Sequence, residues 1–399
     1  MVTTTATPPT GTRSSLLPLV VLSLCGFTSV TTELLPSGLL TRIAADLGTG
    51  IAGAGSLTSV YAAAIVLTVL PLTRFTLRVP RRVLFAAILS VFAAANVLVA
   101  LSPTLPIAIT GRVLAGVAHG LLWATMAPMV GRITSPARAP RAMAIVFAGT
   151  SLGLAAGTPL GTLLGQALGW RVAFLILGGV SAVLAVFAFL TIPKVSPDTK
   201  RPLSLARAAR LPGVGLIIGG WAVMLLAHFA VLTYIAPFLE HAGLGDMVGA
   251  GLAILGIAGL AGVALAGRVP RRALFAGLLA APTLIVAGLL GLGVLPVNLT
   301  AAVVLLSVWG AGYAAAAVFD QQVVLVVGHE APDTVTSLSV VAIQLGIALG
   351  AALGGLTVEA LGVAWIPVTG ATFAAVSVAL RMRLRRYLPR HHTPTTHRI

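Results

Sequence analysis

The chain has 399 residues, of which 58% are hydrophobic and 9% are charged, far below the roughly 25% charged residues of soluble domains, so water is not its main solvent. The net charge of +16 could suggest nucleic acid, but binding phosphate requires basic residues clustered on a soluble module, and here the arginines lie between apolar runs. A single cysteine, Cys25, provides neither a disulfide framework nor a paired metal motif.

Residues 1–14 are rich in Thr and Pro, and we expect a disordered tail. The apolar run that starts at Leu16 continues without a signal-peptide cleavage site, so it is interpreted as a retained first span. Twelve apolar segments of roughly 20 residues, each able to cross ~30 Å of hydrocarbon, predict an all-α integral membrane protein with twelve transmembrane helices. They lie near 16–38, 52–72, 83–101, 106–130, 142–165, 171–192, 213–239, 247–267, 273–295, 300–320, 335–358 and 362–381.

One stretch of the chain occurs twice. Arg78 to Leu89 reads RVPRRVLFAAIL and Arg268 to Leu279 reads RVPRRALFAGLL, with nine of twelve positions identical at an offset of 190 residues. Basic residues followed at once by an apolar run mark the cytoplasmic entrance of a membrane helix. The recurrence predicts two homologous halves inserted the same way up, with these arginines in cytoplasmic loops: Arg78, Arg81, Arg82, Arg268, Arg271 and Arg272.

The distribution of basic residues predicts the orientation. With the amino terminus inside, 22 of the 25 Lys and Arg residues lie in cytoplasmic segments, where they can also attract anionic lipid head groups. We expect six-helix halves at 15–192 and 213–381, a cytoplasmic linker at 193–212 and a basic tail at 382–399. The predicted location is the cytoplasmic membrane of a bacterium, with both termini inside and a monomeric state.

Glu33 is the only one of the nine acids predicted to lie well inside a span. At ~1.5 Å per residue it lies about 25 Å from the cytoplasmic face, and Arg112 lies about 9 Å from the outer face, so both reach a comparable depth. Charges there are costly unless they face each other or a wet cavity. We interpret Glu33 and Arg112 as a proton-coupling pair, and the alternative is a permanent structural ion pair.

Two histidines lie within predicted spans. His119 shares a helical face with Gly116, Gly120, Trp123 and Arg112, because these residues are three or four positions apart. For His119, and for His228 in the seventh span, both a hydrogen-bonded packing role and a proton relay remain open. Asp320, at the end of the tenth span, is expected at the membrane interface, and its part in coupling is also open.

Glycines recur every four residues in two spans. Gly149, Gly153, Gly157 and Gly161 in the fifth span predict close helix packing, and Pro159 among them adds a hinge or seal. For Gly346, Gly350 and Gly354 in the eleventh span we expect packing alone. The chain has no nucleotide-binding P-loop and no H-E-x-x-H motif, so we expect no enzymatic activity, cofactor or metal.

Four motifs carry a resemblance to the major facilitator superfamily, and in particular to twelve-span drug:proton antiporters of the sugar-efflux and chloramphenicol-resistance type. They are TTELLPSGLL with IAADLG (31–40, 43–48), RVLAGVAHG (112–120), GLAAGTPLGTLLGQALGWR (153–171) and TYIAPFLE (233–240). The likeness covers about residues 15–385. The loop 73–82, TRFTLRVPRR, departs from the family pattern, since Leu77 and Pro80 replace the usual aspartate and glycine.

The resemblance implies a major facilitator fold with two six-helix halves, a central cavity lined by spans 1, 4, 7 and 10, and coupling roles for Arg112 and Glu33. It also implies that the segment from Gly153 to Gly161 holds the transport direction toward export.

We therefore predict a proton-coupled antiporter that exports a small organic molecule such as a drug, sugar or metabolite. The alternatives are an importer or sugar exchanger on the same fold, or a transport-inactive membrane receptor or scaffold. The candidate cavity-lining residues are His119, Trp123, His228, Tyr234, Trp309 and Gln344.

Overall fold

A computed structural model describes residues 16–135, 138–193, 209–330 and 332–387, and these residues form helices without any strand. Twelve spans within these ranges are long and apolar enough to cross a bilayer. The prediction of an all-α membrane protein with twelve spans is therefore confirmed. The expected tail at 1–14, most of the expected linker and the end of the basic tail lie outside the described residues.

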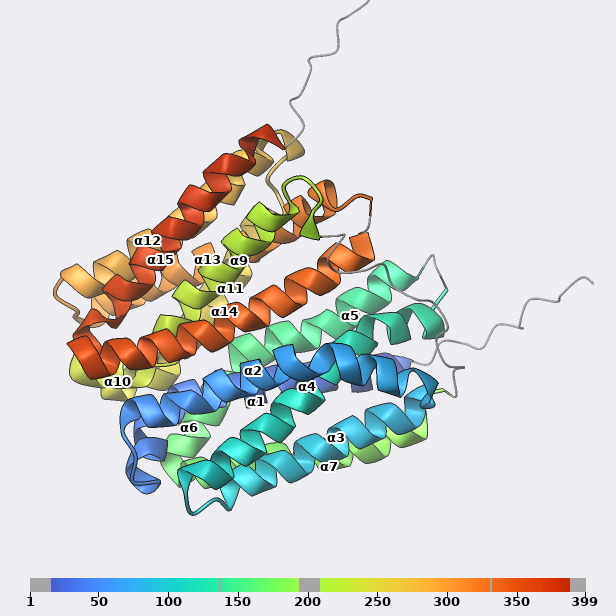
Figure 1. The fold of residues 1–399 in the computed structure, drawn as a ribbon. Coiled ribbons are helices and arrows are strands. Elements are labelled where there is room, and N and C mark those ends of the chain that lie inside the picture. Colours follow the sequence, from blue (N-terminus) through green and yellow to red (C-terminus); the bar gives the residue numbers. More distant parts are fainter. Residues whose placement is uncertain (1–15, 136–137, 194–208, 331, 388–399) are drawn as a thin grey trace, which may run out of the picture.

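The first six spans occupy the blue to green part of Figure 1. The fifth span is one interrupted helix. The first span, α1, runs eight residues beyond its expected end at 38, because a helix continues past the hydrocarbon while its backbone hydrogen bonds are satisfied. The elements are α1 (Leu16–Asp46), α2 (Ile51–Phe75), η1 (Thr76–Arg78), α3 (Arg81–Ala100), α4 (Leu105–Ile133), α5 (Ala139–Leu152), the π-helix η2 (Gly153–Gly157), α6 (Thr158–Leu168) and α7 (Trp170–Thr191).

The second six spans form the yellow-green to red part (Figure 1). The seventh span is broken after Leu232, because Pro237 has no N–H to donate to the carbonyl of Thr233. The elements are α9 (Val214–Leu232), α10 (Ile235–His241), η3 (Gly245–Met247), α11 (Val248–Ala266), η4 (Arg271–Ala273), α12 (Leu274–Val294), α13 (Leu299–Val327), α14 (Pro332–Leu361), η5 (Val363–Trp365), α15 (Ile366–Met382) and η6 (Arg383–Arg386).

Helix neighbours recur between the two parts of the chain. In the first part α2 packs on α4, α3 packs on α4 and α7, and α1 packs on α5 and α7. In the second part α11 packs on α13, α12 packs on α13 and α15, and α9 packs on α14 and α15. Span for span these are the same pairs, as a duplicated bundle would produce.

The repeated arginine motif forms the same turn twice. The N–H of Val79 donates to Thr76 O at 3.0 Å and that of Val269 donates to Ala266 O at 3.2 Å, after which Pro80 and Pro270 precede the next helix. The arginines differ in environment. Arg78, Arg268 and Arg272 are exposed, Arg81 is buried, Arg82 stacks on the Phe189 ring at 4.1 Å, and the side chain of Arg271 lies outside the described structure.

The glycines of the fifth span form one continuous contact with α1. A Cβ added at Gly149, Gly153, Gly157, Gly161 or Gly165 would meet Ser23, Phe27, Thr31, Leu35 or Leu39 in turn, so both helices advance by four residues per contact. The π-helix η2 lies within this contact, just before Pro159, which gives no N–H to the Ala155 carbonyl. The glycines therefore allow the backbones of the first and fifth spans to approach closely.

The glycines of the eleventh span do the same against α9. A Cβ at Gly346, Gly350 or Gly354 would meet the carbonyl oxygen of Ala222, Leu226 or Ala230. These close contacts agree with the packing role expected for the glycines of the eleventh span. They are the second-half counterpart of the contact between the first and fifth spans.

Asp320, which was expected at the membrane interface, is buried inside the protein and paired with Arg381 in the last turn of α15. Both Asp320 and Arg381 are 0% exposed, and the guanidinium binds the carboxylate through Nε to Oδ1 at 3.1 Å and Nη2 to Oδ2 at 2.6 Å. Arg381 also donates to Ser377 Oγ, whose hydroxyl donates to Gly220 O at 2.6 Å. A buried ion pair needs such extra hydrogen bonds to be stable, and this network links α13, α15 and α9. Arg381 is therefore not one of the exposed arginines of the basic tail.

The glycine contact leads to a prediction of stability. Gly149→Ala places a methyl group against the Ser23 carbonyl, so we expect the free energy of unfolding to fall by about 1–3 kcal/mol through overpacking. Gly179→Ala is the matched control, because nothing lies within 4 Å of its added Cβ. Thermal unfolding of the purified protein measures both, and equal melting temperatures for the two variants would contradict the packing account.

The buried ion pair leads to a second prediction. Asp320→Asn leaves the Arg381 guanidinium buried without its counter-charge, which should lower the free energy of unfolding by about 3–5 kcal/mol. The double variant Asp320→Leu, Arg381→Leu removes both charges and should recover most of that loss. Thermal unfolding again provides the readout, and a double variant less stable than the single one would refute this interpretation.

Candidate functional site

Arg112 on α4 is fully buried and donates to three main-chain oxygens. Nε donates to Leu57 O at 3.0 Å, Nη1 to Thr32 O at 2.6 Å and Nη2 to Glu33 O at 3.0 Å. The Thr32 carbonyl needs such a donor, because Pro36 lies four residues further along α1 and has no N–H. The guanidinium therefore ties α4 to α1 and α2.

The Glu33 side chain lies beside this guanidinium without forming an ion pair with it. Glu33 is 7% exposed, and its Oε1 has no hydrogen-bond partner among the described residues. Within the described residues, no carboxylate oxygen of Glu33 lies within 4.0 Å of an Arg112 nitrogen. The charge of Arg112 still attracts the carboxylate. The structure thus brings the two residues together but does not form the permanent ion pair that was the alternative.

Residues of the second half complete the surroundings of Glu33. Gln344 on α14 interacts with the carboxylate through its side chain, is 6% exposed, and has an Oε1 without a partner among the described residues. Tyr313 on α13 is close enough for its hydroxyl to interact electrostatically with the charge of Glu33. The carboxyl group therefore lies where the two halves meet.

Tyr61 connects Arg112 to His119. The Arg112 guanidinium stacks over the Tyr61 ring at 4.2 Å, and the Tyr61 hydroxyl lies 2.7 Å from His119 Nδ1. Ser29 Oγ lies 2.8 Å from the same nitrogen, and the Trp123 ring packs against the imidazole with centroids 5.9 Å apart. His119 is therefore a hydrogen-bonded core residue in the Arg112 cluster, whereas Trp123 is half-buried and its Nε1 has no partner within the described chain.

His228 is held by two aromatic residues of α13. Trp309 Nε1 donates to His228 Nδ1 at 3.0 Å, which fixes this nitrogen as the acceptor. The Tyr313 ring stacks on the imidazole with centroids 3.6 Å apart and an interplanar angle of 5°. Trp309 contacts the imidazole edge-on, with centroids 5.2 Å apart, and is fully buried.

A pocket of about 110 Å³ lies between the two halves. Its walls come from α1, the fifth span, α9, α11 and α13, and none of the described residues that line it has a charged side chain. Among the described residues that were predicted to line a cavity, only His228 lines this pocket, on the same wall as Tyr313. The interrupted fifth span contributes Ser151, Leu154 and Thr158.

Tyr234 lies outside this pocket and closes one end of the interface between the halves. Its hydroxyl donates to Ala351 O of α14 at 2.9 Å. A Cβ at Gly55 on α2, or at Gly354 or Gly355 on α14, would collide with the tyrosine side chain. Tyr234 therefore fills the space between the second and eleventh spans at the end predicted to face outward.

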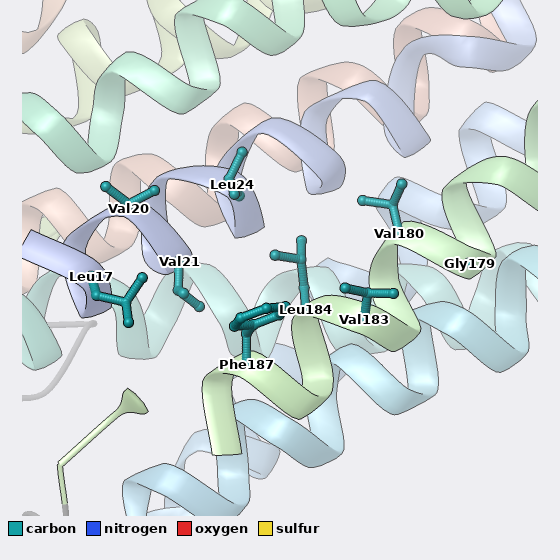
Figure 2. A pocket seen from close by; sticks show the side chains of 9 residues that line it. All are labelled: Leu17, Val20, Val21, Leu24, Gly179, Val180, Val183, Leu184 and Phe187. Atoms are coloured by element: carbon teal, nitrogen blue, oxygen red, sulfur yellow. The ribbon is translucent and has the colours of Figure 1, made fainter. Parts of the chain in front are cut away.

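A second, larger groove of about 510 Å³ lies between α1 and α7, and Figure 2 shows the side chains that line it. Its walls are Leu17, Val20, Val21 and Leu24 from α1 and Gly179, Val180, Val183, Leu184 and Phe187 from α7, without a hydrogen-bonding side chain. Most of these side chains are exposed on the perimeter of the bundle. The groove holds none of the predicted site residues, and its composition is that of a lipid-facing surface.

The sequence did not identify Ser37 and Tyr313 as site residues. A serine beside a proline and a tyrosine in an alanine-rich helix are common, and only the packing of distant spans places both on the pocket. Tyr313 carried one weak signal, because it follows Trp309 by one helical turn.

Three comparisons identify relatives of the chain. It is 34% identical over 363 residues to a chloramphenicol efflux pump of Mycobacterium tuberculosis, covering 86% of each chain. It is 29% identical over 363 residues to a probable sugar efflux transporter of Mannheimia succiniciproducens, covering 90% of this chain and 91% of the relative. The crystal structure of a bacterial homologue of the lysosomal transporter Spinster, in an inward-facing and unoccupied conformation, has the same fold, with a TM-score of 0.75, 16% identity, and coverage of 94% and 98%.

The family itself follows from residues 22–338, which match the model of the Major Facilitator Superfamily. Most of the chain therefore carries the pattern of membrane transporters, which are not enzymes. With the twelve spans described above, the chain belongs to the Major Facilitator Superfamily of multi-pass membrane transporters.

Proposed function

We propose that this transporter is an antiporter that exports a small organic molecule across the bacterial cytoplasmic membrane in exchange for protons. The observation that carries the proposal is the Glu33 carboxyl group, which is buried between the halves with an unpartnered oxygen. The names of the relatives, a chloramphenicol efflux pump and a probable sugar efflux transporter, support export of a small molecule. The excess of arginine in predicted cytoplasmic segments supports an orientation with both termini inside.

Glu33 would act through its charge. A carboxylate buried at this depth is costly, and the nearby positive charge of Arg112 offsets part of that cost without neutralising the group. Protonation removes the charge and changes the interaction with Gln344 across the interface. The two protonation states therefore favour different separations of α1 and α14. A change of protonation thus shifts the equilibrium between relative orientations of the two halves.

The glycine contact would carry this movement to the rest of the first half. Because the glycines from Gly149 to Gly165 pack closely on α1, against its backbone at Gly149 and Gly153 and against its side chains further along, the two helices move as one body. The widened helix η2 and α6 face α11 of the other half, where a Cβ added at Gly256 would lie 2.8 Å from Ala155 Cα. We assign the segment with Pro159 as the seal between the halves on this side.

The direct test is Glu33→Gln, which keeps the shape of the side chain and removes its ability to bind and release a proton. In vesicles with an imposed pH gradient, we expect pH-driven transport of chloramphenicol to fall about tenfold or more. Glu359→Gln is the matched control, since it makes the same chemical change at an exposed acid of α14. Undiminished pH-driven flux in Glu33→Gln, with normal amounts of protein in the membrane, would refute proton coupling through this residue.

Arg112→Lys tests the anchoring of α1. A lysine ammonium is a point charge without the planar fork that reaches three carbonyls, so at least one oxygen is left unsatisfied at a cost of about 1–3 kcal/mol. We expect a lower melting temperature and loss of pH-driven transport. Arg42→Lys is the control, because Arg42 also donates to a main-chain oxygen, of Gln166, but is exposed. If Arg112→Lys matched Arg42→Lys in both measurements, the anchoring role would be wrong.

A further inference from the structure

Neighbouring residues of α1 make different contacts around Glu33. The carbonyls of Thr32 and Glu33 receive the Arg112 guanidinium, and the Glu33 side chain interacts with Gln344. Leu34 and Ser37 instead line the pocket between the halves, opposite α11 and α13. Glu33 does not line that pocket.

The Ser37 hydroxyl is left free for a ligand. Serine and threonine in helices usually donate back to the carbonyl four residues earlier, as Thr125 does to Leu121 O and Ser181 does to Leu177 O, both at 2.7 Å. For Ser37 that carbonyl belongs to Glu33 and already accepts from Arg112 Nη2 at 3.0 Å. Ser37 is 1% exposed, and its Oγ has no partner within the described residues. A buried hydroxyl without a partner requires an explanation, and for this one, which lines a pocket, a ligand would supply the missing hydrogen bond.

The other walls of the pocket suit an apolar molecule. Leucines of α1, α9 and α11 and the flat face of the His228 and Tyr313 stack surround it, and no side chain of the described residues that line it carries a fixed charge. The His228 Nδ1 is already occupied by Trp309. A charged ligand would therefore lose its hydration without gaining a counter-charge, whereas an uncharged ligand would not.

The pocket is narrow in this conformation, and the glycines in its walls leave space for it to widen. Its volume of about 110 Å³ is below the roughly 300–1,000 Å³ of most ligand pockets, so cargo must part α11 from the fifth span. Gly259 on α11 faces Ala314, and an added Cβ would make ordinary contact with it at 3.4 Å. A larger side chain at Gly259 would therefore fit the backbone and fill the pocket.

We propose that this pocket is the cargo site, that it takes an uncharged, mainly apolar molecule whose hydrogen-bonding group is bound by Ser37 Oγ, and that Glu33 does not touch the cargo. The assignment of the ligand as cargo rests on the proposed export function. Proton and cargo then act one helical turn apart on α1, because Glu33 and Ser37 are four residues apart, and this helix couples them without competition for one carboxylate.

Equilibrium binding to the purified full chain in lipid nanodiscs tests the proposal, with uncharged chloramphenicol and cationic tetraphenylphosphonium as ligands. We expect chloramphenicol to bind more tightly than the cation. Ser37→Ala should weaken its binding about tenfold, as expected for one lost hydrogen bond. Gly259→Val should abolish binding. Glu33→Gln should retain saturable chloramphenicol binding, but its dissociation constant should no longer change with pH, because the group that couples the proton to the cargo has lost its titration.

Two matched controls separate these effects from general damage. Ser59→Ala removes another unpartnered hydroxyl, on α2 and outside the pocket, and Gly219→Val adds the same side chain where nothing lies within 4 Å. Both should leave chloramphenicol binding unchanged. Tighter binding of the cation, loss of binding in Glu33→Gln, or absence of saturable chloramphenicol binding would each overturn the proposal.

The two proposals fail in different measurements. If Glu33→Gln still transports with the pH gradient, proton coupling through Glu33 is wrong, whereas the binding data for Ser37 and Gly259 still decide the cargo site. If Ser37→Ala and Gly259→Val bind like the original protein while Glu33→Gln stops pH-driven transport, the cargo site is wrong and the coupling proposal stands.

Discussion

Arg112 donates from α4 to carbonyl oxygens of α1 and α2, including the one that Pro36 leaves without a helical donor. The guanidinium therefore donates its hydrogen bonds to backbone carbonyls and not to the carboxylate of Glu33. Two consequences follow from it. The Glu33 carboxylate keeps an unpartnered oxygen, and the Ser37 hydroxyl finds its usual backbone acceptor occupied. Both free groups lie on α1 at the interface between the halves, where a change of charge or the arrival of a ligand can act on their separation.

The halves are arranged so that a movement of α1 is transmitted. On one side, glycines at every fourth position hold α1 against the fifth span, and the same device holds α9 against the eleventh span. Tyr234 fills the contact between the second and eleventh spans, while the pocket lies between the fifth and eighth spans. Rigid pairs of helices joined at a contact of this kind favour rocking of whole halves over deformation of single helices.

Much of the architecture could be predicted from the sequence, because apolar runs and arginine positions reflect the bilayer directly. The four-residue glycine spacing likewise predicted close contacts. The pairing of side chains could not be predicted, since it depends on which spans meet. A residue count predicts the depth of Asp320 but not its burial against Arg381. The equal depth of Glu33 and Arg112 could be inferred, but the choice of backbone carbonyls over the carboxylate required the coordinates.

The central claim is that Glu33 exists as an unpaired carboxyl group which gains and loses a proton while Arg112 stays on the backbone. Difference infrared spectroscopy of the protein in lipid, across the pH range in which transport responds to the gradient, tests it most directly. The account predicts a carboxylic acid carbonyl band that grows on acidification and is missing from Glu33→Gln. The same band in both proteins would contradict the account, as would a spectrum in which neither protein changes.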